Sequence, residues 1–527
     1  MHVLVVDAIA EEGLAWLRER KFEVEQLHRP PPAVLHARLA EADALITRSG
    51  TAITAELLDH APRLRFVGRA GVGIDNIDVD ACSRRGIVVV NAPFGNVVSA
   101  AEHTVGLILA LVRRLADAQA TLKGGAWDRS IYGSELFRKT MGVVGLGKVG
   151  SRVAARLRSF ETEVLVYDPY IAPTRAAELG VTLTDFETVL RRADLITFHT
   201  PLTDETVNMV TARELALTKP GARIVNCARG GIVNEADLLA ALESGHVAGA
   251  AIDVWSEEPP RAETVRRLIE HPRVVATPHL GANSAEAQIN VAVDVARQLV
   301  AFRDGDLVEF AVNIPVGDPK VVAELRPWVA LAELLGRFGV QLDPGNVAEV
   351  EVTLGGGLAL TDPELLARAV LAGLLRPVIA TPVNLVNAHL VAQERGVEVK
   401  IVRDDDAAGY SSLLSVCVRT DQGRKIIAGT VFDGRPRIVR LRDLHVDFAP
   451  EGYILVLSYE DRPGMVGKIG SVLGRANVNI ASMQVGRRTK RGRAIVVLIL
   501  DEDLTADQVA EVARAVDADF ARLVRLA

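Results

Sequence analysis

A glycine-rich stretch constrains the fold of this chain more than any other feature of its sequence. An apolar run at 141–144 leads directly into Gly145-Leu-Gly-Lys-Val-Gly150, and a second apolar run at 164–167 ends on Asp168. The first glycine permits a tight strand-to-helix turn, the second lets backbone approach a pyrophosphate, and the third lets the helix pack closely on the strand. With an acid about 20 residues after the glycines, the stretch predicts a Rossmann-like α/β domain that binds a dinucleotide.

The acid at the end of the second run bears on which dinucleotide is bound. Asp168 can accept hydrogen bonds from a ribose diol and would repel a 2′-phosphate, which favours NAD over NADP. Arg175 follows closely enough in the sequence to pair with such a phosphate, so NADP stays an alternative.

Length and composition indicate how many domains to expect and which classes of partner are unlikely. The 527 residues exceed what one core can hold, and about 150 residues per domain predict three or four domains. A net charge of -7 gives no chain-wide basic field, which argues against nucleic acid as a partner. Cys82, Cys227 and Cys417 are scattered without metal-like spacing, which fits a reducing cytosol and predicts no metal site. Residues 1–7 are typical of a strand rather than a signal peptide, and the apolar runs are too short for a bilayer, so we expect a cytoplasmic protein without membrane contact.

The residues before the glycine motif predict a small α/β domain of their own. Strand-like runs alternate with helical spacing, as in a parallel sheet, at 2–6, 44–47, 64–67 and 87–90. Residues 284–302 have the pattern of a long helix, and 307–314 would return the chain to this first sheet. We therefore expect a discontinuous, flavodoxin-like substrate domain of residues 1–97 and 284–314, and a nucleotide-binding domain of residues 98–283.

The connection between these two domains is predicted to be helical. Ser99-x-x-Glu102 has the pattern of a capping box. It would open a helix over 104–122 whose first half is apolar nearly all round, which suits a helix buried between two domains.

Two further modules are expected after residue 314. Residues 315–450 predict an α+β module, with strands at 349–354, 413–419 and 425–432 and helices at 363–375 and 383–393. Residues 452–527 have the order β-α-β-β-α-β of a ferredoxin-like domain, and Thr505-x-x-Gln508 predicts a capping box for its second helix. The basic residues of its central hairpin, at 487–493, favour a solvated tip over an anion site.

Four apolar runs of the nucleotide-binding domain end in reactive side chains. They lead to His199, Arg229, Asp253 and His279. Because ligands bind at the carboxyl ends of strands in an open α/β sheet, we expect these residues to face one crevice.

Hydride transfer between NAD and a 2-hydroxy acid needs a proton acceptor, a group that sets its pKa, and a cation for the carboxylate. His279, Glu258 and Arg229 offer these three in turn. From the residues alone, His199 and His103 remain rivals for the base, and Glu257 remains a rival for Glu258.

Several motifs that occur together resemble the D-isomer-specific 2-hydroxyacid dehydrogenases. They are Arg69-Ala-Gly-Val-Gly-Ile-Asp-Asn76, Val144-Gly-Leu-Gly-Lys-Val-Gly150, Asn226-Cys-Ala-Arg-Gly-Gly231, Asp253-Val-Trp-Ser-Glu-Glu-Pro259 and Thr277-Pro-His-Leu-Gly-Ala282. The resemblance covers residues 1–314 and implies that Arg229, Glu258 and His279 are the catalytic set. It also implies cofactor contacts at Gly145, Gly147, Lys148, Val149, Gly150, Asp168, Thr200, Cys227, Ala228, Arg229, Asp253, His279, Gly281 and Ala282. One departure is Ser-Phe-Glu at 159–161, where the family usually has Ala-Phe-Gly.

The C-terminal residues resemble an ACT domain through Asp461-Arg-Pro-Gly464, 466–470 and 477–480. A dehydrogenase with an intervening module and an ACT domain is similar to the long-form D-3-phosphoglycerate dehydrogenases. That resemblance implies NAD-dependent oxidation of 3-phospho-D-glycerate to 3-phosphohydroxypyruvate, the first step of L-serine biosynthesis, in a homotetramer inhibited by L-serine. A glyoxylate or hydroxypyruvate reductase and a nicotinamide-sensing binding protein are the alternatives.

The ligands that this resemblance implies need further side chains. For L-serine we expect Tyr459, Asp461, Asn477 and Asn479, with Asp461 on the ammonium and an asparagine on the hydroxyl. For the phosphorylated substrate we expect Arg48 and Arg69 as cations, together with Gly71 and Asn96.

Overall fold

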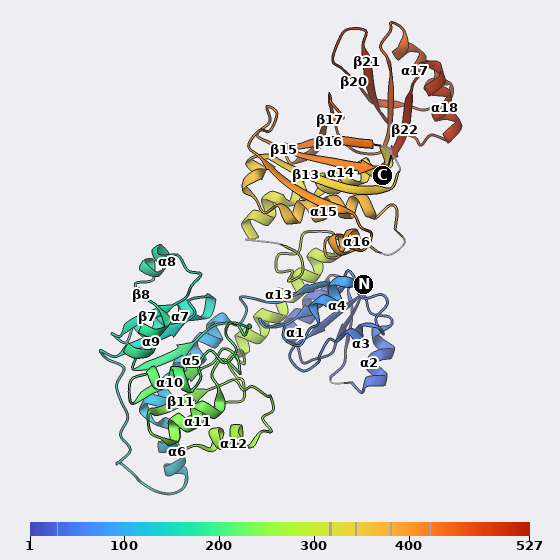
Figure 1. The fold of residues 1–527 in the computed structure, drawn as a ribbon. Helices are drawn as coiled ribbons and strands as arrows, with labels where there is room; N and C mark the ends of the chain where they lie inside the picture. The colour runs from blue at the N-terminus through green and yellow to red at the C-terminus, as the bar shows by residue number, and fades with distance from the viewer. Residues whose placement is uncertain (29, 316–318, 343–344, 380–381, 422, 527) are drawn as a thin grey trace.

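Four β-sheets follow one another along the chain in the computed structural model (Figure 1). The structure describes residues 1–28, 30–315, 319–342, 345–379, 382–421 and 423–526. Within these ranges, none of the helices combines the length and the apolar character that crossing a membrane requires.

The first sheet has five parallel strands in the order β2-β1-β3-β4-β5, which is the flavodoxin-like order. Its strands are β1 (His2–Val5), β2 (Glu23–Gln26), β3 (Ala44–Thr47), β4 (Phe66–Arg69) and β5 (Val88–Val90). Its helices are α1 (Glu11–Glu19), α2 (Pro32–Leu39), α3 (Ala55–Leu58) and α4 (Val79–Arg84). The chain returns to this sheet as the sequence predicts, since α13 (Ala285–Arg303) packs on α1 and Val312 N donates to Val89 O at 2.7 Å.

The second sheet has seven parallel strands in the order β12-β11-β10-β9-β6-β7-β8. They are β6 (Thr140–Val144), β7 (Glu163–Tyr167), β8 (Thr182–Leu183), β9 (Leu195–Phe198), β10 (Ala222–Asn226), β11 (Val247–Ile252) and β12 (Val274–Ala276). Its helices are α7 (Lys148–Arg158), α8 (Pro173–Glu178), α9 (Phe186–Arg192), α10 (Ala212–Leu217), α11 (Glu235–Glu243) and α12 (Glu263–Glu270). The strand order reverses between β6 and β9, so a crevice opens there at the carboxyl ends of the strands.

The helical connection differs from the sequence prediction. The chain forms α5 (Val97–Arg113) and α6 (Leu115–Lys123), separated by Arg114 with a left-handed φ of 53°. The predicted capping box is wrong, because Ser99 lies inside α5 and its hydroxyl donates to Gly281 O at 2.8 Å. α5 packs on α7 and on β10 to β12, so it covers the second sheet.

The third sheet has six strands in the order β14-β13-β15-β16-β17-β18. They are β13 (Val347–Gly356), β14 (Glu398–Asp404), β15 (Ser412–Thr420), β16 (Gly423–Phe432), β17 (Arg435–Leu441) and β18 (Leu444–Phe448), with helices α14 (Pro319–Leu342), η1 (Gly357–Leu360), α15 (Pro363–Leu375) and α16 (Ala388–Glu394). The helix predicted from residue 383 begins only at Ala388. Asn384 and Asn387 form side-chain turns before it, since Asn384 Oδ1 accepts from Val386 N and Asn387 Oδ1 accepts from Asn384 N.

The last sheet has the order β20-β21-β19-β22, with β19 (Tyr453–Glu460), β20 (Ile480–Arg487), β21 (Arg493–Leu500) and β22 (Phe520–Arg525). Helices α17 (Met465–Arg475) and α18 (Ala506–Ala515) complete the predicted β-α-β-β-α-β order, and the capping box of Thr505 and Gln508 is present. The basic hairpin is exposed, but three of its arginines pair with acids: Arg487 with Asp461, Arg488 with Asp443 and Arg493 with Asp519. The predicted fold class is confirmed for all four parts of the chain.

Candidate active site

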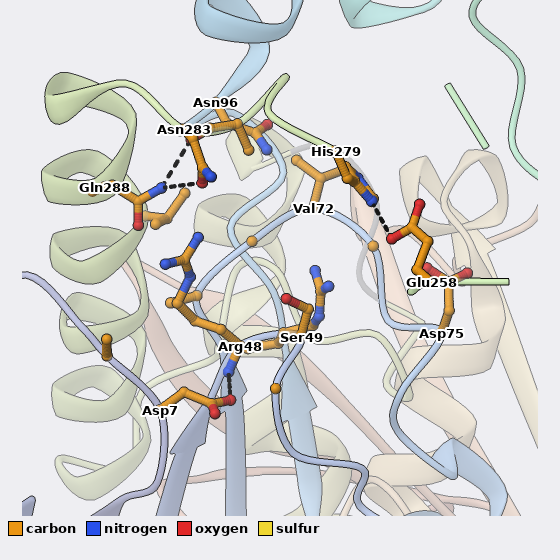
Figure 2. Close-up of a pocket in the computed structure, with 18 of the residues that line it drawn as sticks. Asp7, Arg48, Ser49, Val72, Asp75, Asn96, Glu258, His279, Asn283 and Gln288 are labelled. Carbon is orange, nitrogen blue, oxygen red and sulfur yellow. Dashed lines mark hydrogen bonds and ion pairs between the residues drawn. The ribbon is translucent and has the colours of Figure 1, made fainter. Parts of the chain in front are cut away.

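A cavity of about 590 Å³ lies where the carboxyl ends of the first two sheets face each other. Loops after β1, β3 and β4 form one wall, and loops after β10, β11 and β12 form the other (Figure 2). The residues predicted for catalysis or for substrate that line it are Arg48, Arg69, Gly71, Asn96, Arg229, Glu258 and His279. Strand-end residues far apart in the sequence therefore share one space.

An imidazole and a carboxylate are paired on one side of this cavity. His279 Nδ1 lies 2.8 Å from Glu258 Oε2 (Figure 2). The hydrogen bond that His279 Nδ1–H donates to Glu258 raises the pKa of His279, more strongly than burial lowers it. The same contact, together with the Trp255 N–H, lowers the pKa of Glu258 against the effect of its burial. Glu257 instead accepts from Arg261 N, so the structure pairs the histidine with Glu258 rather than with its neighbour.

The loop that carries His279 is held by a buried acid. Asp253 is fully buried, and its carboxylate accepts from Thr277 Oγ1 at 2.6 Å, Leu280 N at 2.8 Å and Gly281 N at 2.9 Å. His103 Nε2 lies 3.1 Å from the same carboxylate. Although burial favours the neutral acid, these contacts lower the pKa of Asp253 to about 2. The contacts of Asp253 hold the backbone of His279 in the left-handed region, at φ 56°. Because His103 is paired with Asp253, it is not free to act as the rival base.

The other rival histidine, His199, is half-buried beside the glycine turn. His199 Nε2 lies 3.0 Å from Thr197 Oγ1, and burial lowers the pKa of His199 to about 4. Its ring is therefore neutral and lies outside the cavity, so it does not compete with His279 for a substrate proton.

Arg229 enters the cavity from the loop after β10. Its Nη1 donates to Ala228 O at 2.7 Å, and its Nε lies 3.5 Å from Asp75 Oδ2. The glycine that follows is required sterically, because a Cβ on Gly230 would lie 1.9 Å from Trp255 O. The close crossing of these two loops brings the guanidinium to the same cavity as the His279 pair.

The glycine turn between β6 and α7 has room for a diphosphate. Gly145 has φ 90°, and a Cβ on Gly150 would lie 2.0 Å from Gly145 O, so α7 starts as close to the strand as the backbone allows. Apart from its chain neighbours, no described residue lies within 4 Å of the position that a Cβ on Gly147 would take, which leaves open space at the N-terminus of the helix. Thr200 Oγ1 beside the turn is buried without a hydrogen-bond partner among the described residues. These residues fit a bound dinucleotide.

The other predicted cofactor residues lie partly at this turn and partly on the loops after β10 and β12. Asp168 accepts from Leu146 N at 2.7 Å and from Tyr170 N at 2.9 Å, so the acid also fixes the glycine turn. Lys148 Nζ lies 3.8 Å from the centroid of the Phe94 ring, which belongs to the first α/β domain. Burial raises the pKa of the Cys227 thiol to about 12, which keeps it protonated. Val149 packs against the core, Ala228 N donates to Asn226 Oδ1, Gly281 is buried, and Ala282 lines the cavity.

The expected effector residues do not meet within one chain. Asp461 follows the end of β19 where Glu460 pairs with Arg493, whereas Asn479 precedes β20 at the opposite end, where Ile480 pairs with Leu500. Asp461 is paired with Arg487, and Asn479 Nδ2 donates to Asp501 Oδ2 at 2.6 Å. Tyr459 is buried on β19, and Asn477 occupies the left-handed turn after α17.

Sequence reasoning missed several polar residues of the cavity region, among them Asp7, Gln288 and Asn76. Asp7 and Gln288 line the cavity, and Asn76 bonds to the loop that carries Arg48. The position of Asp7 directly after the first strand is the one signal that could have identified it.

Three family models match successive parts of the chain. They are D-isomer specific 2-hydroxyacid dehydrogenase, NAD binding domain (residues 105–281), D-3-phosphoglycerate dehydrogenase intervening domain (324–442) and ACT domain (453–518). The chain is 40% identical over 527 residues to D-3-phosphoglycerate dehydrogenase of Bacillus subtilis (strain 168), with 99% of both chains covered. It is 39% identical over 529 residues to that of Archaeoglobus fulgidus, covering 99% of this chain and 100% of the relative. The chain belongs to the D-3-phosphoglycerate dehydrogenases.

Solved structures agree with the dehydrogenase half. D-lactate dehydrogenase from Aquifex aeolicus, complexed with NAD and lactic acid, has a TM-score of 0.52 at 28% identity and covers 58% of this chain and 96% of its own. NAD-dependent formate dehydrogenase from Staphylococcus aureus, in complex with NAD, has a TM-score of 0.52 at 31% identity, covering 58% and 97%. The predicted family is confirmed, and the chain is an NAD-dependent 2-hydroxyacid dehydrogenase.

The imidazole pair of this dehydrogenase predicts a pH dependence. With His279 as the expected base, oxidation would need its neutral form, because only the free imidazole can accept a proton. Since Glu258 raises the pKa of His279, kcat/KM for oxidation should rise with pH through a midpoint above the ordinary histidine value of 6.5. Glu258→Gln removes the charge that favours the imidazolium, so the midpoint should move to lower pH in a profile of kcat/KM. A midpoint that stays in place in this variant would show that another group titrates.

Proposed function

We propose that the protein oxidises 3-phospho-D-glycerate to 3-phosphohydroxypyruvate with NAD, as the first step of L-serine synthesis. The observation that carries this proposal is the single cavity shared by the His279 and Glu258 pair and three arginines, Arg48, Arg69 and Arg229. A histidine base serves any 2-hydroxy acid, whereas three guanidiniums suit a substrate with both a carboxylate and a phosphate. The full-length relatives of this chain carry the name D-3-phosphoglycerate dehydrogenase, which supports the same substrate.

Each side chain has a distinct task in the proposed reaction. His279 takes the proton of the C2 hydroxyl as the C–H bond at C2 breaks, and Glu258 stabilises the imidazolium that forms. Arg229 holds the carboxylate and polarises the adjacent carbonyl, while Arg48 and Arg69 hold the phosphate. The turn from Gly145 to Gly150 would hold NAD, which would supply the acceptor for the hydride that leaves C2. In reverse, the imidazolium returns its proton to the carbonyl oxygen.

The proposed division of labour follows the sheets. Residues 1–97 and 284–314 bind substrate, residues 98–283 bind NAD, residues 315–450 form the intervening module, and residues 452–527 bind the effector. The boundary after residue 314 lies beside residues 316–318, which are outside the described ranges.

We also propose a homotetramer that L-serine inhibits. None of the residues of α6 is buried, and the segment after it exposes Trp127 by 81% and Tyr132 by 82%, which fits a surface covered by a second copy. Because Asp461 and Asn479 lie at opposite ends of one sheet, an effector site made from both needs two ACT domains. A regulatory site between copies would couple serine binding to assembly.

The assay that tests this proposal measures NADH at 340 nm with 3-phospho-D-glycerate, with and without L-serine. We expect turnover with the phosphorylated acid and inhibition by serine. In Asp461→Ala we expect serine inhibition to be lost and uninhibited turnover to be kept. Turnover of unphosphorylated acids alone would contradict the substrate, and inhibition that persists in Asp461→Ala would place the effector elsewhere.

A further inference from the structure

A buried acid lies directly beneath the cavity, on the side of the first sheet. Asp7 follows β1 and is only 5% exposed. Its Oδ2 accepts from Arg48 N at 2.7 Å (Figure 2). The same oxygen accepts from Thr47 Oγ1 at 2.8 Å, and Oδ1 accepts from Thr51 Oγ1 at 3.2 Å. A Cβ on Gly50 would lie 2.5 Å from Asp7 Oδ1. The loop of residues 47–51 is therefore wrapped around this carboxylate.

A second residue ties the same loop to the neighbouring strand end. Asn76 Nδ2 donates to Arg48 O at 2.7 Å and to Thr51 O at 2.6 Å. Its Oδ1 accepts from Arg69 Nε at 2.8 Å. One amide thus links the main chain at Arg48 with the side chain of Arg69, so the two loops cannot move independently without breaking these bonds.

The charges of the cavity explain why such anchoring is needed. Burial lowers the pKa of Arg69 to about 10, and Arg48 and Arg229 add to that effect. Like charges at close range repel in a partly desolvated site, and Asp7 is the buried negative charge on this wall. Yet Asp7 forms no ion pair with a guanidinium in the described part of the chain. Its acceptors are used by main chain and hydroxyls, which leaves the Arg48 guanidinium unpaired, among the residues described, and available to a ligand.

We propose that Asp7 and Asn76 are positioning residues that set specificity for a phosphorylated substrate. They act through Arg48 and Arg69, by fixing the loop of residues 47–51 and by placing a counter-charge behind it. This inference rests on the proposed function, in which these two arginines hold the phosphate. Neither residue takes part in proton or hydride transfer, so the step they affect is binding of the phosphate end.

The test is Asp7→Asn, assayed with 3-phospho-D-glycerate and NAD. The side chain keeps its size and one acceptor oxygen but loses its charge and its second acceptor. Since hydrogen bonds to charged groups are worth a few kcal/mol, we expect KM to rise about tenfold or more, with kcat within about twofold. The Kd of NAD should stay unchanged. An acid that served only stability would lower the melting temperature and leave KM as it was.

A matched control lies at the amino ends of the strands of the same sheet, just before β3. Asp43 accepts from His2 N at 2.8 Å and from Arg63 Nη2 at 2.9 Å, so it also ties main chain together, but away from the cavity. Asp43→Asn should change stability without changing KM. Thr51→Val removes one hydrogen-bond donor to Asp7 and leaves every charge, so it should also raise KM, by a smaller factor than Asp7→Asn. This variant keeps the inference testable if Asp7→Asn does not fold.

A double-mutant cycle decides whether Asp7 acts through Arg48. Arg48→Ala alone should raise KM, and adding Asp7→Asn to it should raise KM by less than about twofold further. Two independent, multiplying effects would overturn the inference, as would an unchanged KM in Asp7→Asn and in Thr51→Val. The wild-type protein separates the positioning role from the proposed function on which it rests. If the wild type turns over 3-phospho-D-glycerate but KM is unaltered in Asp7→Asn and in Thr51→Val, only the positioning role is overturned. Absence of wild-type turnover overturns the proposed function, and the positioning role with it.

Discussion

His279→Asn is expected to lower kcat by about 10² to 10⁴, the usual contribution of a positioned acid or base, while the Kd of NAD stays nearly unchanged. Asparagine keeps a polar side chain beside Glu258 but cannot accept the hydroxyl proton near neutral pH. The backbone of the loop is held by Asp253, which accepts from Leu280 N and Gly281 N, so the substitution should leave the loop in place. Steady-state kinetics measure kcat, and the quenching of intrinsic protein fluorescence during a titration with NAD measures the Kd.

His271→Asn is the matched control for this variant. His271 lies at the opposite end of β12, where its Nδ1 accepts from Arg273 N at 3.1 Å, outside the cavity. It should leave kcat within about twofold. Equal losses of NAD affinity and kcat in His279→Asn would mean that the histidine maintains the structure of the loop instead of moving a proton.

Gly150→Ala is expected to have the second large effect. The added Cβ would lie 2.0 Å from Gly145 O, well inside van der Waals contact with backbone, so α7 must move away from β6. We expect a loss of stability of about 1–3 kcal/mol from overpacking, and at least a tenfold rise in the Kd of NAD because the N–H groups of the helix leave their positions. Thermal unfolding and a binding titration measure these effects.

Gly147→Ala, three residues earlier, separates packing from cofactor approach. In the described part of the chain, only its sequence neighbours lie within 4 Å of its Cβ position, so stability should change by less than about 0.5 kcal/mol. The methyl group would face the space that we assign to the pyrophosphate, so NAD affinity should still fall. If Gly147→Ala binds NAD as well as the wild type, the diphosphate does not lie against this turn.

Much of the dehydrogenase half could be predicted because local signals there agree with the fold. The glycines between β6 and α7 and the alternation of strands and helices predict one crevice at the carboxyl ends of the strands. The prediction that four strand-end residues face this crevice is only half right, because Arg229 and His279 line the cavity, whereas Asp253 is buried and His199 lies outside it. The pairing of His279 with Glu258 rather than Glu257 could not be derived from spacing, because adjacent glutamates on a loop differ only in direction. The structure shows that difference through separate partners, Arg261 N for Glu257 and the imidazole for Glu258.

Other features escaped prediction because tertiary contacts overrode local patterns. Ser99 and Glu102 match a capping box, but the hydroxyl of Ser99 bonds to the loop at Gly281, so the helix starts two residues earlier, at Val97. Asn384 and Asn387 delay α16 through side-chain turns that helical spacing does not reveal. Asp7 was not identified beforehand because its partners, Arg48 and Thr51, are about 40 residues away and come together only when β1 pairs with β3.

The most direct test of the account follows the atom that moves. Given NAD and 3-phospho-D-glycerate that carries deuterium at C2, the protein should form 3-phosphohydroxypyruvate and a reduced nicotinamide ring bearing that deuterium, as mass spectrometry of the NADH would show. NADH without the label, or no NADH at all, would contradict hydride transfer at the cavity that His279, Glu258 and Arg229 share.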